Sequence, residues 1–220
     1  MPQSIAIDGP AGAGKSTLGK ALAEQLGFVY VDTGALYRAV GYYVWNKRGD
    51  KYTEDDVVAD LQEIEIEQQL IDGHTEIYLN GLDISKDIRD EKISMVASRV
   101  SGFKEVRRFL LGLQRKLAEK SDVVMDGRDI GTVVLPNADI KIFLTASCEV
   151  RATRRKSQLE EAGKNATYDE VLQTLKERDH NDSNRQIAPL KSANDAHFFD
   201  NSEKSFEEAL QELYELVREG

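Results

Sequence analysis

The sequence predicts an α/β fold in which a parallel β-sheet is covered by helices on both faces. Short apolar runs typical of buried strands alternate with longer segments whose apolar residues recur at helical spacing. A glycine-rich loop joins the first such run to the first helical segment. Strand-like alternation between helices is confined to residues 63–84. The 220 residues therefore suit one domain with an inserted subdomain.

Composition and charge restrict the partners that we expect. The formal net charge of −10 argues against broad binding to nucleic acid or to a membrane surface, so anionic ligands would need local arginine clusters. The longest apolar runs are too short to span a bilayer, and MPQSIAIDG lacks the features of a secretory signal. The single cysteine, Cys148, excludes an internal disulfide and favours a reducing compartment, so we expect a cytoplasmic protein.

The first loop has the spacing of a phosphate-binding loop. The apolar run IAID at 5–8 leads into GPAGAGKST at 9–17, which fits G-x-x-x-x-G-K-[ST]. Its glycines let backbone N–H groups converge on phosphate oxygens, and Lys15 can bridge the β- and γ-phosphates. The hydroxyl of Ser16 or Thr17 can reach Mg²⁺. A glycine-rich turn without a ligand is the alternative, but strand, loop and helix follow one another as a phosphate site requires.

The segments after this loop continue the alternation. Leucines at every fourth residue from position 18 predict a helix that ends at Gly27. A second strand, FVYV, then leads to Asp32 and Thr33, which are suited to cap a helix over 35–47. Thr53 with Asp56 predicts a capping box for a short acidic helix.

The period changes between residues 63 and 84. Isoleucines alternate with glutamates, and the dipeptides Asp72-Gly73 and Asn80-Gly81 separate three short β-like runs. This pattern predicts a three-stranded antiparallel meander. We interpret it as an inserted subdomain because it lies between helices of an otherwise alternating chain.

Two amphipathic helices follow the meander. The apolar positions that line them are Ile93, Val96 and Val100, and then Val106, Leu110, Leu113 and Leu117. Buried strands are expected at 123–125 and 140–146, with a weaker candidate at 196–200.

Three more helices are expected around these last strands. Two cover 148–162 and 168–179, the second capped by Thr167 and Glu170, and Ser205 with Glu208 caps the third. The core face predicted for the third helix holds Phe206, Leu210, Leu213 and Val217.

Ligands of a parallel sheet bind beyond the C-terminal ends of its strands, so the loops after Ile7, Val31 and Met125 should meet. The third of these loops begins DGRD, an arginine between carboxylates. Asp126 closes an apolar strand and suits a carboxylate that holds Mg²⁺ directly or through water. A turn-forming aspartate before Gly127 is the alternative.

Two basic clusters could bind phosphate groups. Arg151, Arg154 and Arg155 lie in one helical stretch, and Arg178, Asp182 and Arg185 recur at turn spacing if their helix continues. Arginine offers a planar fork that suits phosphate oxygens. A solvated basic helix face and an exposed helix end with charge pairs are the alternatives.

The histidines and the cysteine predict no site of their own. His74, His180 and His197 show neither metal-ligand nor triad spacing. Cys148 suits a small residue at a helix start rather than a nucleophile.

Five segments resemble the bacterial cytidylate kinase family in their order and spacing: GPAGAGKST, DTGALYRA, VRRFLLGLQR, MDGRDIGTVVLPNADIKIFL and KERDHNDSNRQIAPL. The resemblance runs over nearly the whole chain, and DTGALYR, DGRDIGT and ERD-x-x-D-x-x-R are more specific than the phosphate loop. It implies a nucleoside-monophosphate kinase: a P-loop core with a five-stranded parallel sheet, an inserted monophosphate-binding subdomain with a small antiparallel sheet, and a short ATP lid. The implied division is a core of about 1–36, 98–150 and 180–220, a subdomain of about 37–97 and a lid of about 151–179.

The resemblance also implies the residues that bind the acceptor nucleotide. Asp129 and Thr33 would accept from the exocyclic amine of cytosine, while Arg107 and Arg185 would donate to the base edge. Arg128 and Arg38 would clamp the monophosphate, and Tyr37 would also bind substrate. The ribose would meet Ser98, Arg178 and Asp182.

ATP and Mg²⁺ are the implied donor and cofactor. ATP would lie on Gly9, Pro10, Ala11, Gly12, Ala13, Gly14, Lys15, Ser16 and Thr17, with Arg155 from the lid. Ser16 and Asp126 would hold the metal. Lys15, Arg128 and the lid arginines, Arg154 with Arg151 or Arg155, would balance charge during transfer.

The implied reaction is ATP with CMP or dCMP, giving ADP with CDP or dCDP. The acceptor is already a phosphate oxygen, so no strong general base is required. The rival interpretations are another acceptor, such as UMP, AMP or a non-nucleotide, and a nucleotide-dependent switch without an acceptor. A nucleic-acid-binding protein fits the net charge poorly. We expect a monomer.

Overall fold

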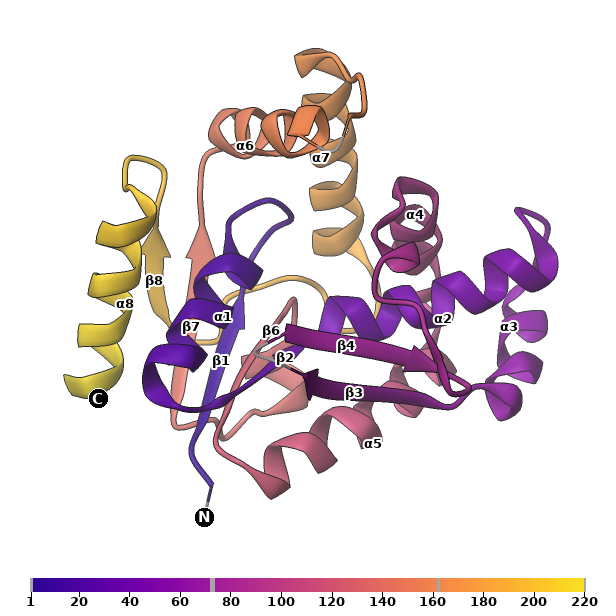
Figure 1. Cartoon of the computed structure of the whole chain (residues 1–220), viewed down its shortest axis with the longest axis horizontal. Coiled ribbons are helices and arrows are strands. Elements are labelled where there is room, and N and C mark those ends of the chain that lie inside the picture. Colours follow the sequence, from indigo (N-terminus) through magenta and orange to yellow (C-terminus); the bar gives the residue numbers. More distant parts are fainter. Residues whose placement is uncertain (1, 72–73, 162, 220) are drawn as a thin grey trace.

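A five-stranded parallel sheet forms the centre of the computed structural model, which describes residues 2–71, 74–161 and 163–219 (Figure 1). The strand order is β2–β6–β1–β7–β8, and all neighbours pair in parallel. The strands are β1 (Ser4–Asp8), β2 (Val29–Asp32), β6 (Val123–Gly127), β7 (Ile140–Thr145) and β8 (His197–Asp200). The predicted α/β fold with a parallel sheet is confirmed.

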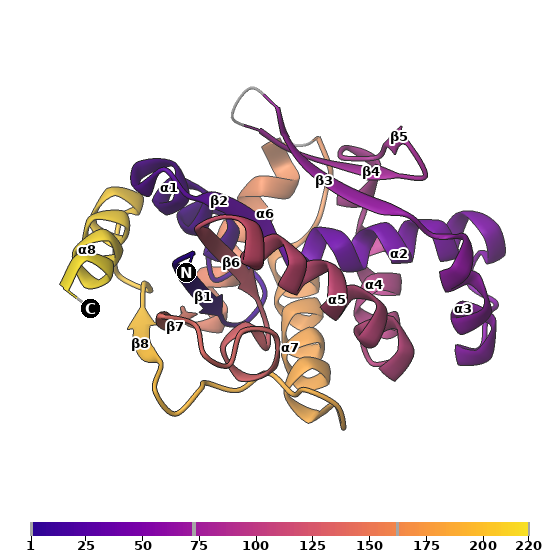
Figure 2. The same cartoon turned by 90° about the horizontal axis from the view of Figure 1, so that it is seen from below.

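Helices cover both faces of this sheet. On one face α1 (Lys15–Leu26) and α8 (Phe206–Glu219) lie side by side, and their leucines pack against Ile5, Ile7 and Ile142 (Figure 2). On the other face α5 (Lys104–Lys120) and a π-helical turn, η3 (Ile130–Val134), cover Val31 and Met125. Each fully buried aliphatic side chain of this kind contributes about 2 kcal/mol by leaving water.

The inserted segment packs around an apolar cluster that it shares with α5. It consists of α2 (Thr33–Arg48), α3 (Glu54–Asp60), η1 (Leu61–Glu63), β3 (Ile66–Ile71), β4 (His74–Leu79), β5 (Leu82–Asp83), η2 (Asp87–Arg89) and α4 (Glu91–Val100). The three strands form an antiparallel sheet in the order β3–β4–β5, which confirms the predicted meander. Asn80 and Gly81 both adopt positive φ, 51° and 79°, as a tight hairpin turn requires. The other predicted turn, Asp72-Gly73, lies outside the described residues.

A helical hairpin lies beyond the C-terminal ends of the strands. It is formed by α6 (Cys148–Glu161) and α7 (Tyr168–Asn184), which Figure 1 shows above β7 and β8. Ala152, Val171 and Leu175 pack with Ala11 of the phosphate loop. The hairpin is therefore attached to the loop that precedes α1.

Two local predictions need correction. Helix α7 continues past residue 179 to Asn184, and Arg185 then leaves it with φ −65° and ψ 143°. Phe206 was expected in the core but is 43% exposed. It occupies the first position of α8, whereas Ala209, Leu213 and Val217, spaced by four residues, form the buried stripe.

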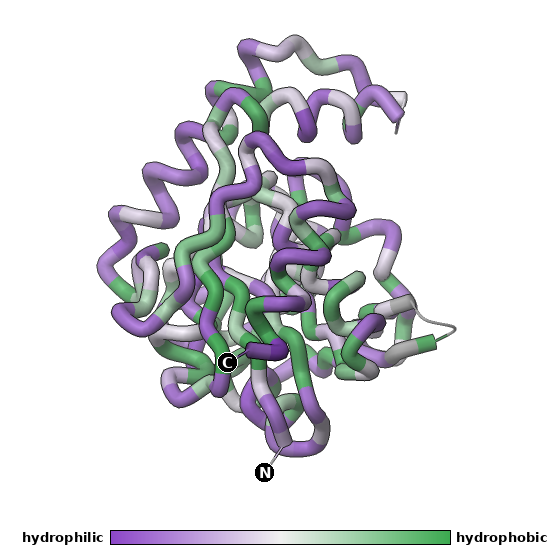
Figure 3. Tube along the Cα trace, turned by 90° about the vertical axis from the view of Figure 1, so that its left-hand side faces the viewer, coloured by the Kyte–Doolittle hydropathy of each residue, from purple (hydrophilic) through white to green (hydrophobic). Residues whose placement is uncertain are grey.

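The hydropathy of the chain follows these layers. Figure 3 shows the hydrophobic residues gathered along the central strands and the hydrophilic ones on the outer helices. Among the described residues, no helix combines the length and the apolar character needed to cross a bilayer.

Candidate active site

The C-terminal ends of β2, β6 and β1 meet at one edge of the sheet. The register pairs Asp8 with Gly127 and Asp32 with Asp126. The loops that follow these strands therefore lie together, as the sequence predicted. This edge lies between the helical hairpin and the inserted segment.

Backbone geometry shapes the phosphate loop, residues 9–17. Gly9 has φ +152°, and a Cβ there would lie 1.9 Å from the carbonyl oxygen of Leu144, so this position has no room for a side chain. Gly14 is the left-handed N-cap of α1 and offers no side-chain cap to the helix. The first N–H groups of α1 are thus open to an anion.

Lys15 lies within the curve of its own loop. Its Nζ donates to the carbonyl oxygen of Pro10 at 2.8 Å, and the side chain is buried. Burial, and secondly the nearby charge of Arg128, lower the pKa of Lys15 to about 7. A bound phosphate would favour the charged form and draw it toward the ligand.

Ser16 and Asp126, the predicted metal pair, come together. Ser16 Oγ donates to Asp126 Oδ2 at 3.0 Å, and the hydroxyl of Tyr30 donates to Oδ1 at 2.8 Å. Burial, and next the charge of Asp32, raise the pKa of Asp126 to about 6. Thr17 is exposed and has no such contact.

These donors fit a magnesium ion. A hydroxyl and a carboxylate on adjacent elements, completed by phosphate and water oxygens, are the ligands that Mg²⁺ takes at nucleotide sites. The described part of the chain holds no group of three or more His, Cys, Asp or Glu side chains suited to a metal. A site made by protein alone is thus absent there, and the fit depends on bound phosphate.

Asp129 lies buried between two arginines. It forms an ion pair with Arg107, and Nη2 of Arg185 lies 3.5 Å from its Oδ1. The guanidinium of Arg107 also lies 5.7 Å from the ring centroid of Tyr37. Burial raises the pKa of Asp129, while Arg107 and then Arg185 oppose the shift. Burial likewise raises the pKa of Tyr37 to about 12, so this phenol stays neutral.

A second buried pair adjoins this group. Arg128 Nε donates to Asp182 Oδ2 at 2.7 Å. Arg178 lies close to both; burial, and then the charge of Arg128, lower its pKa. The side of α7 that carries Arg178 and Asp182 is therefore turned inward, whereas His180, Asn181, Ser183 and Asn184 are exposed.

Arg38, Thr33 and Ser98 differ in their contacts. Arg38 Nη2 donates to Asp32 Oδ2 at 2.9 Å, and the Thr33 hydroxyl donates to the carbonyl oxygen of Asp126 at 2.7 Å. The Thr33 oxygen therefore remains free to accept. Ser98 is half-buried on α4, and among the described contacts its side chain is not joined to the other site residues.

Each of the three arginines of α6 has protein partners. Arg151 is buried, donates to the carbonyl oxygens of Ala146 and Ala11, and pairs with Asp179 at 2.7 Å. Arg154 donates to the side chain and the carbonyl of Asn201, both at 2.9 Å. Arg155 pairs with Glu91 of α4 at 2.6 Å. The stretch is therefore not a solvated basic face.

Three residues of this edge were missed by the sequence analysis. Asp8 accepts from the backbone N–H groups of Ile130 and Gly131, and Asn201 Nδ2 donates to the carbonyl oxygen of Ala13. Asp8 is the last residue of β1, and Asn201 directly follows β8. The same position at the C-terminal end of a strand was the signal that identified Asp126. Tyr30, inside β2, had no comparable signal.

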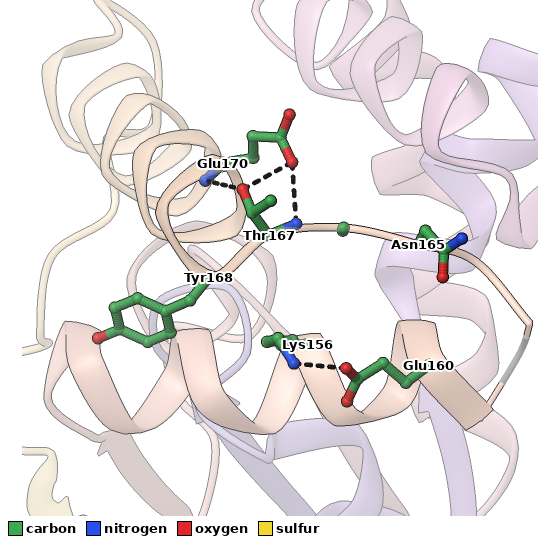
Figure 4. A pocket seen from close by; sticks show the side chains of 7 residues that line it. Lys156, Glu160, Asn165, Thr167, Tyr168 and Glu170 are labelled. Carbon is green, nitrogen blue, oxygen red and sulfur yellow. Dashed lines mark hydrogen bonds and ion pairs between the residues drawn. The ribbon is translucent and has the colours of Figure 1, made fainter.

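A hollow between α6 and α7 lies apart from these groups (Figure 4). Four of its polar side chains pair with one another: Lys156 with Glu160, and Thr167 with Glu170 in the capping box of α7. None of the predicted site residues lines it. We therefore assign it to the packing of the hairpin.

Comparison with known proteins shows the family to which the sequence is similar. A profile of the family described as cytidylate kinase matches residues 5–219. The cytidylate kinase of Caldicellulosiruptor bescii is 48% identical, over 97% of this chain and 94% of that protein. The cytidylate kinase of Thermodesulfovibrio yellowstonii is 46% identical, over 100% of this chain and 99% of that protein.

Solved structures show the same fold at low sequence identity. The crystal structure of an uncharacterized protein from Eubacterium ventriosum superimposes with a TM-score of 0.52 at 13% identity, over 99% of each chain. This likeness shows the fold alone.

Proposed function

The chain belongs to the cytidylate kinase family and transfers the γ-phosphoryl group of ATP to CMP or dCMP, and from this premise we propose a role for each group of the site. Family membership decides between a kinase and a switch, which the motifs alone had left open. The observation that carries the assignment of roles is the buried Asp129 between Arg107 and Arg185, directly beside Arg128.

Asp129 reads the acceptor base. Cytosine presents an exocyclic amine as donor, and a ring nitrogen and a carbonyl oxygen as acceptors. Asp129, with the free lone pairs of Thr33, accepts from the amine, while Arg107 and Arg185 donate to the two acceptors. Burial raises the pKa of Asp129, and the two arginines oppose that rise, which favours the ionised, hydrogen-bond-accepting form of the carboxylate. Tyr37 supports the Arg107 guanidinium.

Arg128 and Arg38 clamp the acceptor phosphate. Each is paired with a carboxylate in the free protein, Asp182 and Asp32 respectively, so the phosphate takes over part of an existing ion pair. Asp182, with Arg178 and Ser98, then meets the ribose. The clamp holds the attacking oxygen in place, which is the main requirement of an in-line transfer.

The phosphate loop and Lys15 bind the donor. The N–H groups of residues 9–17 surround the β- and γ-phosphates, and Lys15 leaves Pro10 to contact them. Ser16 and Asp126 would hold Mg²⁺, which supplies positive charge to the β- and γ-phosphate oxygens when bound. Tyr30 orients Asp126 from its other oxygen.

Arginines of the α6–α7 hairpin complete the charge balance. Arg154 is supported through Asn201, which also holds the Ala13 carbonyl of the loop. Arg155 has to release Glu91 before it can reach ATP, and Arg151 acts by holding the Ala11 carbonyl. The hairpin serves as a lid that excludes water, because water could otherwise accept the phosphoryl group.

We further propose the division into a core, a monophosphate subdomain at about 37–97 and a lid at about 151–179. Apolar clusters centred on the inserted segment and on the hairpin support it; the first also packs on Val106 and Leu110 of α5 and the second on Ala11, where these parts join the core. We propose a monomer working in the cytoplasm, since one chain supplies every group above and a lone cysteine suits a reducing compartment. Sedimentation with and without nucleotide tests the monomer.

Asp129→Asn tests the base-reading role. An amide can donate to the carbonyl that uracil has in place of the amine, so we expect kcat/KM for CMP to fall about 100-fold more than kcat/KM for UMP. Initial rates with CMP, dCMP, UMP, AMP and GMP measure this. Asp182→Asn is the matched control, because a residue that meets the ribose and pairs with the phosphate-binding Arg128 should affect CMP and UMP alike. Equal losses in Asp129→Asn would refute the assignment.

A further inference from the structure

The turn that follows Asp129 has an unusual cap. η3 (Ile130–Val134) is a π-helical turn in which the N–H of Leu135 donates to the carbonyl of Ile130 at 2.7 Å. Asp129 occupies its N-cap position, where an aspartate normally accepts from the first free N–H groups of the turn. Its side chain makes no such bond.

Asp8 takes these N–H groups instead. Its Oδ1 accepts from Ile130 at 2.7 Å and its Oδ2 from Gly131 at 2.8 Å, across 122 and 123 residues of sequence. Asp8 is only 4% exposed, and a Cβ on Gly131 would lie 3.4 Å from Asp8 Oδ2. The carboxylate therefore fits closely against the start of the turn.

We propose that Asp8 is a positioning residue that caps this turn in place of Asp129 and so keeps the Asp129 carboxylate directed at the acceptor base. The inference rests on the base-reading role proposed for Asp129. With its capping task taken over, Asp129 is free to face Arg107 and Arg185.

Asp8 also lies next to the loop that binds the donor nucleotide. It precedes Gly9 of the phosphate loop directly, and β1 lies between β6 and β7. One side chain thus fixes the acceptor-reading turn relative to the donor loop. Without it, the Asp129 carboxylate, which stands at the N-cap position, would be able to accept from the free N–H groups, and capping would draw that carboxylate away from the base.

Asp8→Asn tests the proposal. Asparagine has the same shape but accepts at one atom only, and its NH₂ would face a second donor. We expect the ratio of kcat/KM for CMP to that for UMP to fall about tenfold, while the Kd of ADP changes less than twofold. A residue with a merely structural role would lower the melting temperature and leave the ratio unchanged.

Asp139→Asn is the matched control. Asp139 also accepts from a backbone N–H of β1, that of Ser4 at 2.7 Å, but at the opposite end of the strand. It should leave the ratio unchanged. If Asp8→Asn fails to fold, Asp8→Glu replaces it, since the longer side chain keeps the charge but displaces the carboxylate.

The double variant separates this inference from the proposed function. If Asp8 acts through Asp129, Asp8→Asn adds no further loss of the ratio in an Asp129→Asn background. A folded Asp8→Asn enzyme with an unchanged ratio, or an additive loss in the double variant, overturns the role of Asp8. An unchanged ratio in Asp129→Asn overturns the base-reading role, and with it the action of Asp8 through that residue.

Discussion

The donor end and the acceptor end of the site use different chemical groups: backbone N–H groups at the first and paired arginine side chains at the second. The donor loop consists of contiguous residues, 9–17, and offers backbone N–H groups at the start of α1. The acceptor end consists of arginines from separate elements, each already paired with a carboxylate: Arg38 with Asp32, Arg107 with Asp129 and Arg128 with Asp182.

Because of this difference, the donor end binds polyphosphates in general, whereas the acceptor end selects its ligand. Backbone N–H groups bind any polyphosphate, whereas a ligand at the acceptor end has to exchange with existing ion pairs. A poor match leaves buried charges without partners, which is costly. The acceptor end therefore carries the selectivity, within a chain of net charge −10.

Removing the donor lysine should have the largest effect. We expect Lys15→Met to lower kcat about 1,000-fold, because its charge is needed where the phosphoryl group moves. The Kd of CMP, measured by calorimetry without ATP, should change less than about twofold. A parallel loss of CMP affinity would show that the two ends are not separable.

Removing the acceptor clamp should have the next largest effect. We expect Arg128→Ala to raise KM about 30-fold for CMP and by the same factor for UMP, since the phosphate is common to both. Arg108→Ala is the control, because Arg108 has a side chain 77% exposed on α5. A larger factor for CMP would place Arg128 among the base-reading groups.

The pH dependence of ATP binding tests the contribution of the Lys15 charge at the donor end of the site. The pKa of Lys15 is lowered to about 7 in the free protein, and bound phosphates raise it again. Binding above pH 7 therefore takes up a proton, and from pH 7 to 8 the affinity for MgATP should weaken about fivefold. Lys15→Arg keeps its charge over this pH range, so its affinity for MgATP should not show this fivefold decrease. Calorimetric titration of both proteins with MgATP at pH 7 and pH 8 measures the difference.

We expect the smallest effect at Arg155. This arginine is proposed to bind ATP, but like the arginines of the acceptor end it is paired with a carboxylate in the free protein. Glu91→Gln removes its partner on α4, and because this pair is partly exposed we expect the KM for ATP to fall only about twofold. Glu160→Gln, which removes the partner of Lys156 on the same helix, should change nothing. An increase in the KM for ATP would mean that the pair assists ATP binding.

The sequence could predict whatever depends on near neighbours. The strand, loop and helix around Lys15 are specified by consecutive residues, and the capping boxes at Thr53 and Thr167 are pairs three residues apart. Both were confirmed. Their physics is local, so a short pattern suffices.

The sequence predicted that distant loops meet at one edge of the sheet, but not which of their side chains contact each other. Asp8 meets Ile130 across 122 residues, and Arg128 meets Asp182 across 54. A strand-end aspartate predicts that a polar group lies at the sheet edge but not which N–H group it accepts from. The exposure of Phe206 likewise depends on where α8 begins relative to the sheet.

The contact of Asn201 with Ala13 has a consequence for synthesis of the protein. The amide of Asn201 supports the phosphate loop across 188 residues and also holds Arg154. A growing chain on the ribosome carries the complete loop sequence from its first moments but lacks this support until residue 201 has emerged. The nucleotide site is therefore encoded early and assembled late, so a nascent chain has little capacity to sequester ATP before most of the fold exists.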